Sequence, residues 1–262
     1  MTIFQLDFRS GLRALLIWTG VIAFMLVISI AVFPQMKSQT AALDEMYAGL
    51  GDLTKAFGLD IISMSDLIGF YATECGSVLG IGGGIFAAIL GASALAREEK
   101  DRTAKFLLSH PISRTRVVGE KLLAVLAQLT VLNIAVCLIS LSSFSLINEW
   151  PDMGQFFLLH LANFILQIEI ASVCFGISAF APGGAVGIGI GIAATLYFTN
   201  IIRNIAEKAD FLKFITPFSY SDAANILPEK KLDLLLIGVG LCYAVIGIAA
   251  AFAHYEKKDI AA

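Results

Sequence analysis

Two acidic residues stand alone in long apolar stretches, and their carboxyl groups are the first candidates for chemistry. Glu74 is the one charged residue in 67–96, and Glu169 is the one charged residue in 153–202. A charge within a membrane span costs about 2.5–3.5 kcal/mol on insertion scales, so it usually faces a cavity or a polar partner. We expect each carboxyl either to line a translocation path or cation site, or to form a structural hydrogen bond with a nearby polar group such as Gln167.

The other reactive side chains form no catalytic or metal-binding pattern. The three histidines belong to no H-E-x-x-H motif, and the sequence has neither a G-x-S-x-G motif nor a G-x-x-x-x-G-K-[ST] phosphate loop. The four cysteines match neither zinc-site nor secreted disulfide spacings, so we expect free, buried thiols. There is no basic stripe with interleaved aromatic residues for nucleic acid. These observations favour a protein that is not an enzyme and uses no cofactor or metal.

The densest run of charge lies at 97–116, between two apolar stretches. Within it, Ala104, Leu107 and Leu108 would form an apolar stripe on a helix that ends soon after at Pro111. We therefore expect a short amphipathic helix at this point, followed by a longer helix that Ser113 caps. Such a helix can rest on lipid head groups or insert into a soluble partner. The alternative is a positively charged loop that merely fixes the topology.

The elements that must position these residues are membrane spans. The chain has 262 residues, a mean hydropathy of +0.82 and only 15% charged residues, against about 25% in soluble domains. The charges cluster and leave gaps long enough for helices of about 20 residues, which is what a span requires. One gap of 50 residues holds two spans, because Pro182 and the glycines after it favour a turn midway. The sequence therefore predicts an all-α polytopic membrane protein with six spans, at 12–33, 67–96, 119–147, 155–181, 184–202 and 234–255.

The distribution of basic residues predicts the orientation. Six spans place both termini on one side, and eleven of the 18 Lys and Arg residues fall on that side. The positive-inside rule then predicts cytoplasmic termini and a multi-pass protein of the cell (plasma) membrane. We expect 1–262 to be a single transmembrane domain without a nucleotide-binding domain.

Outside the spans, apolar residues recur at helical spacing in three places. We expect an interfacial helix at 1–13 that leads into the first span, an amphipathic helix at 43–57 on the outer side, and a less regular one at 203–230 that ends at Pro228. Glycines also recur four residues apart, in spans 2 and 5. Small residues at this interval let helices approach closely in lipid, either within one subunit or between subunits.

The segment between spans 2 and 3 resembles the type-2 ABC transporter permeases. The resemblance rests on several features in a fixed order. A span end of small residues leads into a Glu-rich charged turn, here Gly91-Ala-Ser-Ala-Leu-Ala-Arg97-Glu98-Glu99, and Thr103 follows. The pattern continues with Leu107-Leu108-Ser109 and Pro111-Ile112-Ser113-Arg114, and ends with Lys121, which enters span 3. Two further matches are Thr216-Pro217-Phe218-Ser219-Tyr220 before span 6 and Tyr255-Glu-Lys-Lys-Asp259-Ile260 at the end. At Asp101-Arg102 the chain departs from the family, which more often has glycine before the threonine.

This resemblance implies the membrane subunit of an ABC exporter. Two permease chains, identical or different, would pair with two copies of a separate ATPase subunit. The segment between spans 2 and 3 would be the coupling helix that contacts the ATPase. Leu107 and Leu108 would supply buried contact, and the pairing and register at the rim would come from Glu98, Glu99, Arg102 and Arg114.

Two other functions remain open on the sequence. A stand-alone secondary transporter or channel would use Glu74 and Glu169 for ion coupling, and a non-transport membrane enzyme or assembly factor would need neither ATPase nor substrate path. A self-sufficient carrier has no need of an amphipathic helix between spans 2 and 3, and many carriers carry an internal repeat, which we do not find between 1–130 and 131–262. An enzyme needs clustered reactive side chains. The exporter subunit is therefore the preferred hypothesis; its substrate cannot be read from the sequence.

Overall fold

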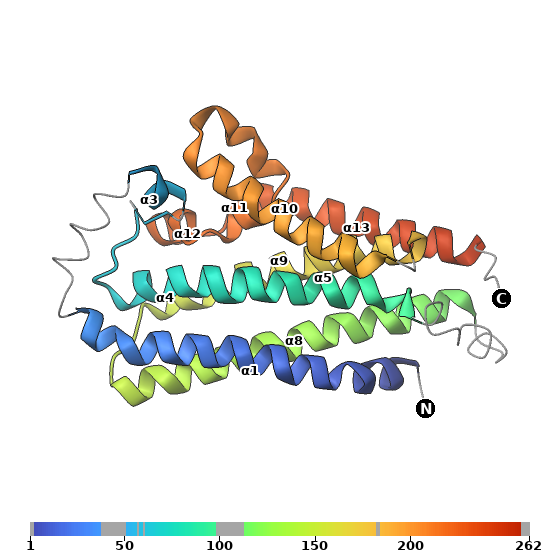
Figure 1. Cartoon of the computed structure of the whole chain (residues 1–262), viewed down its shortest axis with the longest axis horizontal. Coiled ribbons are helices and arrows are strands. Elements are labelled where there is room, and N and C mark those ends of the chain that lie inside the picture. Colours follow the sequence, from blue (N-terminus) through green and yellow to red (C-terminus); the bar gives the residue numbers. More distant parts are fainter. Residues whose placement is uncertain are drawn as a thin grey trace.

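The computed structural model of the chain describes residues 3–37, 51–56, 58–59, 61–97, 113–181 and 184–257. Within these ranges every regular element is helical, and six helical segments are long and apolar enough to cross a membrane. The predicted all-α fold with six spans is therefore confirmed. The spans run alongside one another to form an elongated bundle (Figure 1).

The span boundaries follow the predicted ones closely, except that the first helix begins nine residues earlier than expected. The second span is a composite of three helical pieces. The spans are α1 (Ile3–Lys37), then α4 (Leu67–Cys75), η1 (Gly76–Gly82) and α5 (Gly83–Ala94) as one composite, α8 (Arg114–Ile147), α9 (Met153–Phe180), α10 (Ala185–Ile205) and α13 (Leu234–Lys257).

The expected interfacial helix at 1–13 is not a separate element. Its described residues continue into α1 without a break, and Ile3 packs against Val117 and Tyr255 in a buried cluster. At 1.5 Å per residue, α1 is roughly 50 Å long, which exceeds the hydrocarbon core of about 30 Å. Its first turns therefore extend the bundle beyond the apolar core.

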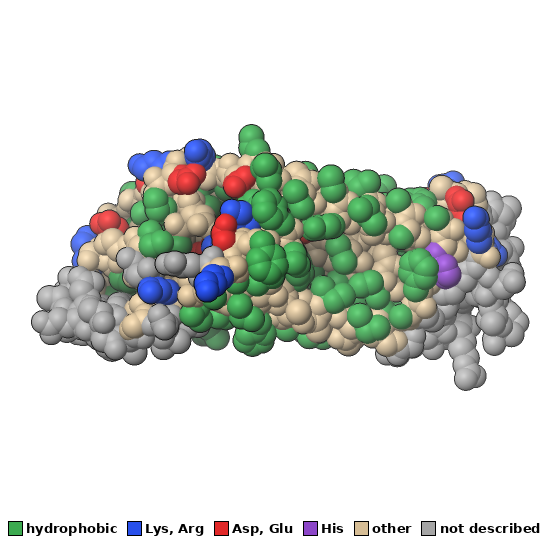
Figure 2. Space-filling view, turned by 90° about the horizontal axis from the view of Figure 1, so that it is seen from above, with side chains coloured by type: hydrophobic (Ala, Val, Ile, Leu, Met, Phe, Trp, Pro, Cys, Tyr) green, Lys and Arg blue, Asp and Glu red, His purple; other side chains and the backbone are tan. Residues whose placement is uncertain are grey.

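The start of α1 and the end of α13 lie at the same end of the bundle (Figure 1). The surface seen in Figure 2 is hydrophobic across its middle, and its charged side chains gather mainly towards the two ends. This is the distribution that a lipid environment requires. The cytoplasmic position of the termini stays a prediction, because the bundle itself does not distinguish the two sides.

The centre of the bundle is formed by α9 and the composite second span. In each, 61% of the most apolar stretch is buried, against 22% for α10. These helices approach closely where glycine removes the side chain: a Cβ at Gly91 would lie 2.1 Å from the carbonyl oxygen of Ala171 on α9. In the absence of a hydrophobic drive between helices in lipid, such close contact stabilises the bundle.

The glycines four residues apart behave differently in the two spans. A Cβ at Gly84 of span 2 would meet Ile170 at 3.4 Å, so this glycine packs within the chain as predicted. In span 5, a Cβ added at Gly187 or Gly191 would meet no atom of the described residues within 4 Å, and the close contact is made instead by Gly189. Packing within one subunit therefore explains the span 2 glycines but not Gly187 and Gly191.

The second span contains a π-helical stretch, η1, which the sequence prediction did not include. The wider turn changes which backbone N–H and C=O groups are hydrogen-bonded to each other. Polar side chains of neighbouring helices lie against this stretch. Gln167 of α9 donates from Nε2 to the carbonyl oxygen of Leu79 at 3.3 Å, and its Oε1 accepts from Asn133 of α8 at 2.6 Å. Short π-helical insertions in α-helices are frequent at functional sites.

At the opposite end of the bundle from the termini, short helices replace the predicted amphipathic segment at 203–230. They are η2 (Glu207–Phe214), α11 (Phe218–Ser221) and α12 (Ala223–Glu229). The chain turns between them because Pro217 begins α11 and Asp222 caps α12, accepting from the N–H of Ala224 at 3.1 Å. Pro228 lies inside α12 rather than ending it, and Lys230 follows in the left-handed region with a φ of 52°. Of the helix expected at 43–57, the described part includes α3 (Asp52–Ala56).

The start of α9 at this end is fixed by Asp152. Its carboxylate accepts from the N–H groups of Gly154 and Gln155, at 2.9 and 3.3 Å, and pairs with Lys230 at 3.2 Å. The hydrogen bond from Gln155 and the pairing with Lys230 hold the pKa of Asp152 below its ordinary value, since both favour the ionised form. The cap therefore ties α9 to the turn after α12.

Candidate functional site

The predicted coupling segment lies largely outside the described residues. This applies to Glu98, Glu99, Arg102, Leu107 and Leu108, about whose positions nothing follows from the structure. The two points at which the segment leaves and re-enters the bundle are described. It departs after α5 and returns at Ser113, whose hydroxyl accepts from the N–H of Arg116 at 3.3 Å, as the predicted cap requires.

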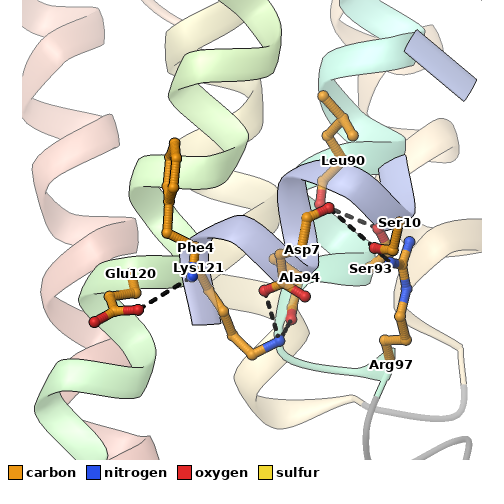
Figure 3. Close-up of polar contacts among 9 residues, drawn as sticks. All are labelled: Phe4, Asp7, Ser10, Leu90, Ser93, Ala94, Arg97, Glu120 and Lys121. Atoms are coloured by element: carbon orange, nitrogen blue, oxygen red, sulfur yellow. Dashed lines mark hydrogen bonds and ion pairs between the residues drawn. The ribbon is translucent and has the colours of Figure 1, made fainter. Parts of the chain in front are cut away.

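A buried lysine joins three helices beside the point of departure (Figure 3). Lys121 of α8 is 1% exposed; its ammonium group donates to Asp7 of α1 at 3.0 Å and to the carbonyl oxygen of Ala94 at 2.9 Å. Ala94 is the last residue of α5, so its carbonyl lacks a partner within the helix. The charge of Lys121 thus binds the end of α5 to α1 and α8.

Two further contacts strengthen this junction (Figure 3). The N–H of Phe4, in the first turn of α1, donates to Glu120 at 3.1 Å, and Arg116 pairs with the same carboxylate at 2.8 Å. Arg97 donates from its guanidinium to the hydroxyl of Ser10 on α1. We call Asp7, Ala94, Arg97, Glu120 and Lys121, with the groups they bind, the Lys121 cluster.

Arg114, the one predicted coupling residue in the described chain, binds the end of α13. Its guanidinium donates to the carbonyl oxygens of Tyr255 and Glu256, at 3.3 and 3.0 Å. Thr115 donates to the Glu256 carboxylate at 2.7 Å. A cation at a helix C-terminus satisfies unpaired carbonyls and complements the helix dipole. The start of α8 is thereby fixed to the last helix of the chain.

Glu74 and Glu169 lie in separate environments. Glu74 of α4 is half-buried and accepts a hydrogen bond from the hydroxyl of Ser29 on α1, at 3.1 Å. Glu169 of α9 is 4% exposed, and its Oε2 accepts from the hydroxyl of Tyr220 on α11, at 2.9 Å. The partner of Glu169 is therefore on another element; Gln167 instead bonds to η1 and α8.

The remaining candidate groups are packed in the core or lie on its surface. His160 is buried in an aromatic cluster, and its Nε2 lies 2.8 Å from the hydroxyl of Tyr71. All four cysteines are free, but only Cys75 and Cys174 are buried; Cys242 is exposed, contrary to expectation, because its side of α13 faces away from the bundle. No group of three or more His, Cys, Asp or Glu in the described ranges is arranged for a metal.

The sequence prediction missed the partners of the key charged groups. Lys121 was noted as part of a motif, yet Asp7 lies 114 positions away and carries no signal that would pair the two. Tyr220 was noted as part of a Pro-Phe-Ser-Tyr run without a link to Glu169. A lysine close to the start of a span would have been a usable signal, since a charge at that depth needs a partner.

Comparison with known proteins agrees with this architecture. A family described as "ABC-2 family transporter protein" matches residues 1–260. The chain is also similar to the uncharacterized protein YhcI of Bacillus subtilis (strain 168), with 24% identity over 203 residues. That alignment covers 68% of this chain and 64% of YhcI. With six membrane-spanning helices and a family match over nearly its whole length, the chain belongs to the ABC-2 family of transporter proteins.

Proposed function

We propose that this chain is the permease subunit of an ABC exporter, driven by ATP hydrolysis in a separate ATPase chain. The observation that carries the proposal is the Lys121 cluster. It fixes both borders of 98–112 to the bundle, with Ala94 and Arg97 on one side and the start of α8 on the other. A segment that transmits force from a partner needs such rigid attachment at its ends.

The proposed mechanism is mechanical. Closure of two ATPase subunits displaces the coupling helix, and the displacement passes to α5 and α8. Because Lys121 binds Asp7, α1 moves with them. Arg114 extends the same connection to α13 through the carbonyl of Tyr255. The chain's own residues perform no covalent step; they couple motion to access of a path that Glu74 and Glu169 would line.

A second permease chain is part of this proposal. On the face of α10 that carries Gly187 and Gly191, no atom of the described residues lies within 4 Å of a Cβ added at either glycine, which leaves room for close approach of another helix. The copy could be identical or different. With ATPase subunits in the cytoplasm, the termini would face the cytoplasm of a cell whose plasma membrane holds the complex, as the basic residues predict.

The stand-alone carrier has less support. Its two proposed coupling residues take different partners, Ser29 for Glu74 and Tyr220 for Glu169. These separate partners give no support to a shared ion site between the two carboxyl groups.

The proposal is tested by placing charge on the apolar stripe of the coupling segment. In Leu107→Glu/Leu108→Glu, the chain should insert and fold normally but lose association with its ATPase, because a carboxylate in a buried contact is left unpaired. The measurement is the amount of ATPase recovered with the tagged chain from detergent-solubilised membranes.

The matched control places two glutamates on the opposite face of the predicted helix, as Lys105→Glu/Ser109→Glu. This variant should retain most of its ATPase. Equal recovery of ATPase with wild type and with Leu107→Glu/Leu108→Glu would refute the coupling-helix assignment.

A further inference from the structure

A cavity of about 560 Å³ lies between α9, α10 and α13; it is a hollow that is broadly open to the lipid-facing surface, where its lining residues Phe180 and Ile246 are 55% and 64% exposed. Its walls are apolar: Val173 and Ile177 come from α9, Ile192 from α10, and Ile246 from α13. The volume falls within the range of roughly 300–1,000 Å³ that is usual for sites of small organic ligands. The walls alone would accept any apolar molecule of this size.

One carboxyl group interrupts the apolar lining. Glu169 is the single charged residue of the cavity wall. Its Oε2 accepts from Tyr220, and it rests on Gly240 of α13, where a Cβ would lie 2.0 Å from Oε2. No Lys, Arg or His of the described residues pairs with it within 4.0 Å. The carboxyl is therefore held in place by a hydroxyl and a backbone contact, without a cation.

The depth of Glu169 restricts what can reach it. It lies 11 residues before Phe180, the end of α9, and 16 residues after Met153, the start. At 1.5 Å per residue these distances are roughly 17 and 24 Å, so the carboxyl lies near the middle of the span. Lipid head groups lie outside a hydrocarbon core about 30 Å thick, too far for their amines to contact this carboxyl.

An acidic residue at this depth normally pairs with a cation or faces a polar cavity. Here the cavity is apolar and no basic residue of the described ranges pairs with Glu169, so charge complementarity points to the ligand. One aromatic side chain of the same wall, Tyr243, is three residues along α13 from Gly240 and can contribute to binding a cation through its ring face. The matching molecule has an apolar body and one cationic nitrogen.

We propose that the cavity between α9, α10 and α13 binds a membrane-dissolved amphiphile that carries a protonated amine, with the amine on Glu169 and the apolar body along α10 and α13. Tyr220 orients the carboxylate by donating to Oε2. On the exporter function proposed above, on which this interpretation rests, the amphiphile is the class of substrate that the permease takes from the bilayer.

Binding of matched twelve-carbon probes tests the site. Purified full-length chain in phosphatidylcholine nanodiscs is titrated with radiolabelled dodecylamine and with dodecanol, and binding to empty discs is subtracted. Wild type should bind the amine saturably and at least about tenfold more tightly than the alcohol, which corresponds to about 1.4 kcal/mol. Absence of saturable amine binding, or equal binding of the two probes, overturns the proposal.

Variants separate the two parts of the site. Glu169→Gln should reduce the preference for the amine to about twofold or less, whereas Glu149→Gln, which removes a carboxyl that pairs with Lys37 outside the cavity, should leave it intact. Ile246→Trp, at a side chain that is 64% exposed in the cavity wall, should weaken both probes by filling the apolar part. Persistence of the preference in Glu169→Gln, or of full binding in Ile246→Trp, overturns the proposal.

Lipid composition distinguishes the source of the amine. Exchanging phosphatidylcholine for phosphatidylethanolamine should leave dodecylamine binding unchanged. Weaker dodecylamine binding in phosphatidylethanolamine would mean that the lipid's amine competes for the site, which would identify the head group as the occupant and contradict the assignment. The binding measurement requires this chain alone, without an ATPase. A negative binding result is therefore distinguishable from a failure of the proposed exporter function. A chain that associates with an ATPase but does not discriminate between the probes contradicts only the present inference.

Discussion

Single charged residues account for the organisation of this molecule at its two functional regions. Lys121 is buried at one end of the bundle and satisfied by a carboxylate and a carbonyl oxygen, whereas Glu169 is buried near mid-span with one hydroxyl partner. A fully paired ion connects structural elements; an acid without a cation beside a cavity is available to a ligand. The difference in partners is the basis for proposing a connecting role for Lys121 and a binding role for Glu169.

Lys121 should be important for stability. Replacing it with Met leaves Asp7 without its cation and the Ala94 carbonyl without a donor. Breaking a buried ion pair by removing one partner costs about 3–5 kcal/mol. Because Asp7 retains 20% exposure, we expect the lower end, about 3 kcal/mol, in the free energy of unfolding measured by denaturant titration in detergent.

Two variants serve as controls for this prediction. Lys121→Arg keeps the charge and should lose less stability than Lys121→Met. Asp7→Asn/Lys121→Met removes both charges and should recover part of the loss, since no unpaired carboxylate remains. Unfolding of Lys121→Met at the wild-type denaturant concentration would show that the ion pair has no structural role.

At the level of elements, helix contacts in this bundle depend on glycines at particular faces. Gly91→Ala should lower the free energy of unfolding by about 1–3 kcal/mol, because the added methyl group would lie 2.1 Å from a backbone oxygen of α9 that cannot move independently. Thermal unfolding of the purified chain in detergent measures the effect. Gly20→Ala on α1, where no atom of the described residues lies within 4 Å of the added methyl group, is the matched control and should be near neutral. A similar unfolding temperature for both variants would contradict the close α5–α9 packing.

Elements were predicted from the sequence to very different degrees. The spans followed from gaps between charges, because the cost of charge in lipid is a property of the residue and needs no tertiary knowledge. The π-helical turn of η1 was missed, since its backbone contact comes from Gln167 of another helix, which Asn133 of a third helix in turn hydrogen-bonds. The short helices at 207–229 were read as one amphipathic segment because Pro217 and Asp222 act through local turns within an apolar pattern.

For the whole molecule, the family and the fold agree with the initial resemblance, and the site was only partly accessible from sequence. Glu169 was identified from its isolation in an apolar run, but Tyr220, Gly240 and the cavity beside it come from three other elements. Pairings between residues far apart in the chain carry no local pattern. For the same reason, the sequence did not predict Asp7 as the partner of Lys121.

The central claim is that an external ATPase drives this chain, and its most direct test is ATP hydrolysis by the complex isolated from native membranes through a tag on this chain. The account predicts hydrolysis that purifies with the wild-type chain and is absent from preparations of Leu107→Glu/Leu108→Glu, although that variant inserts normally. A well-folded wild-type chain that purifies without any ATP hydrolysis, yet transports when reconstituted alone, would contradict it.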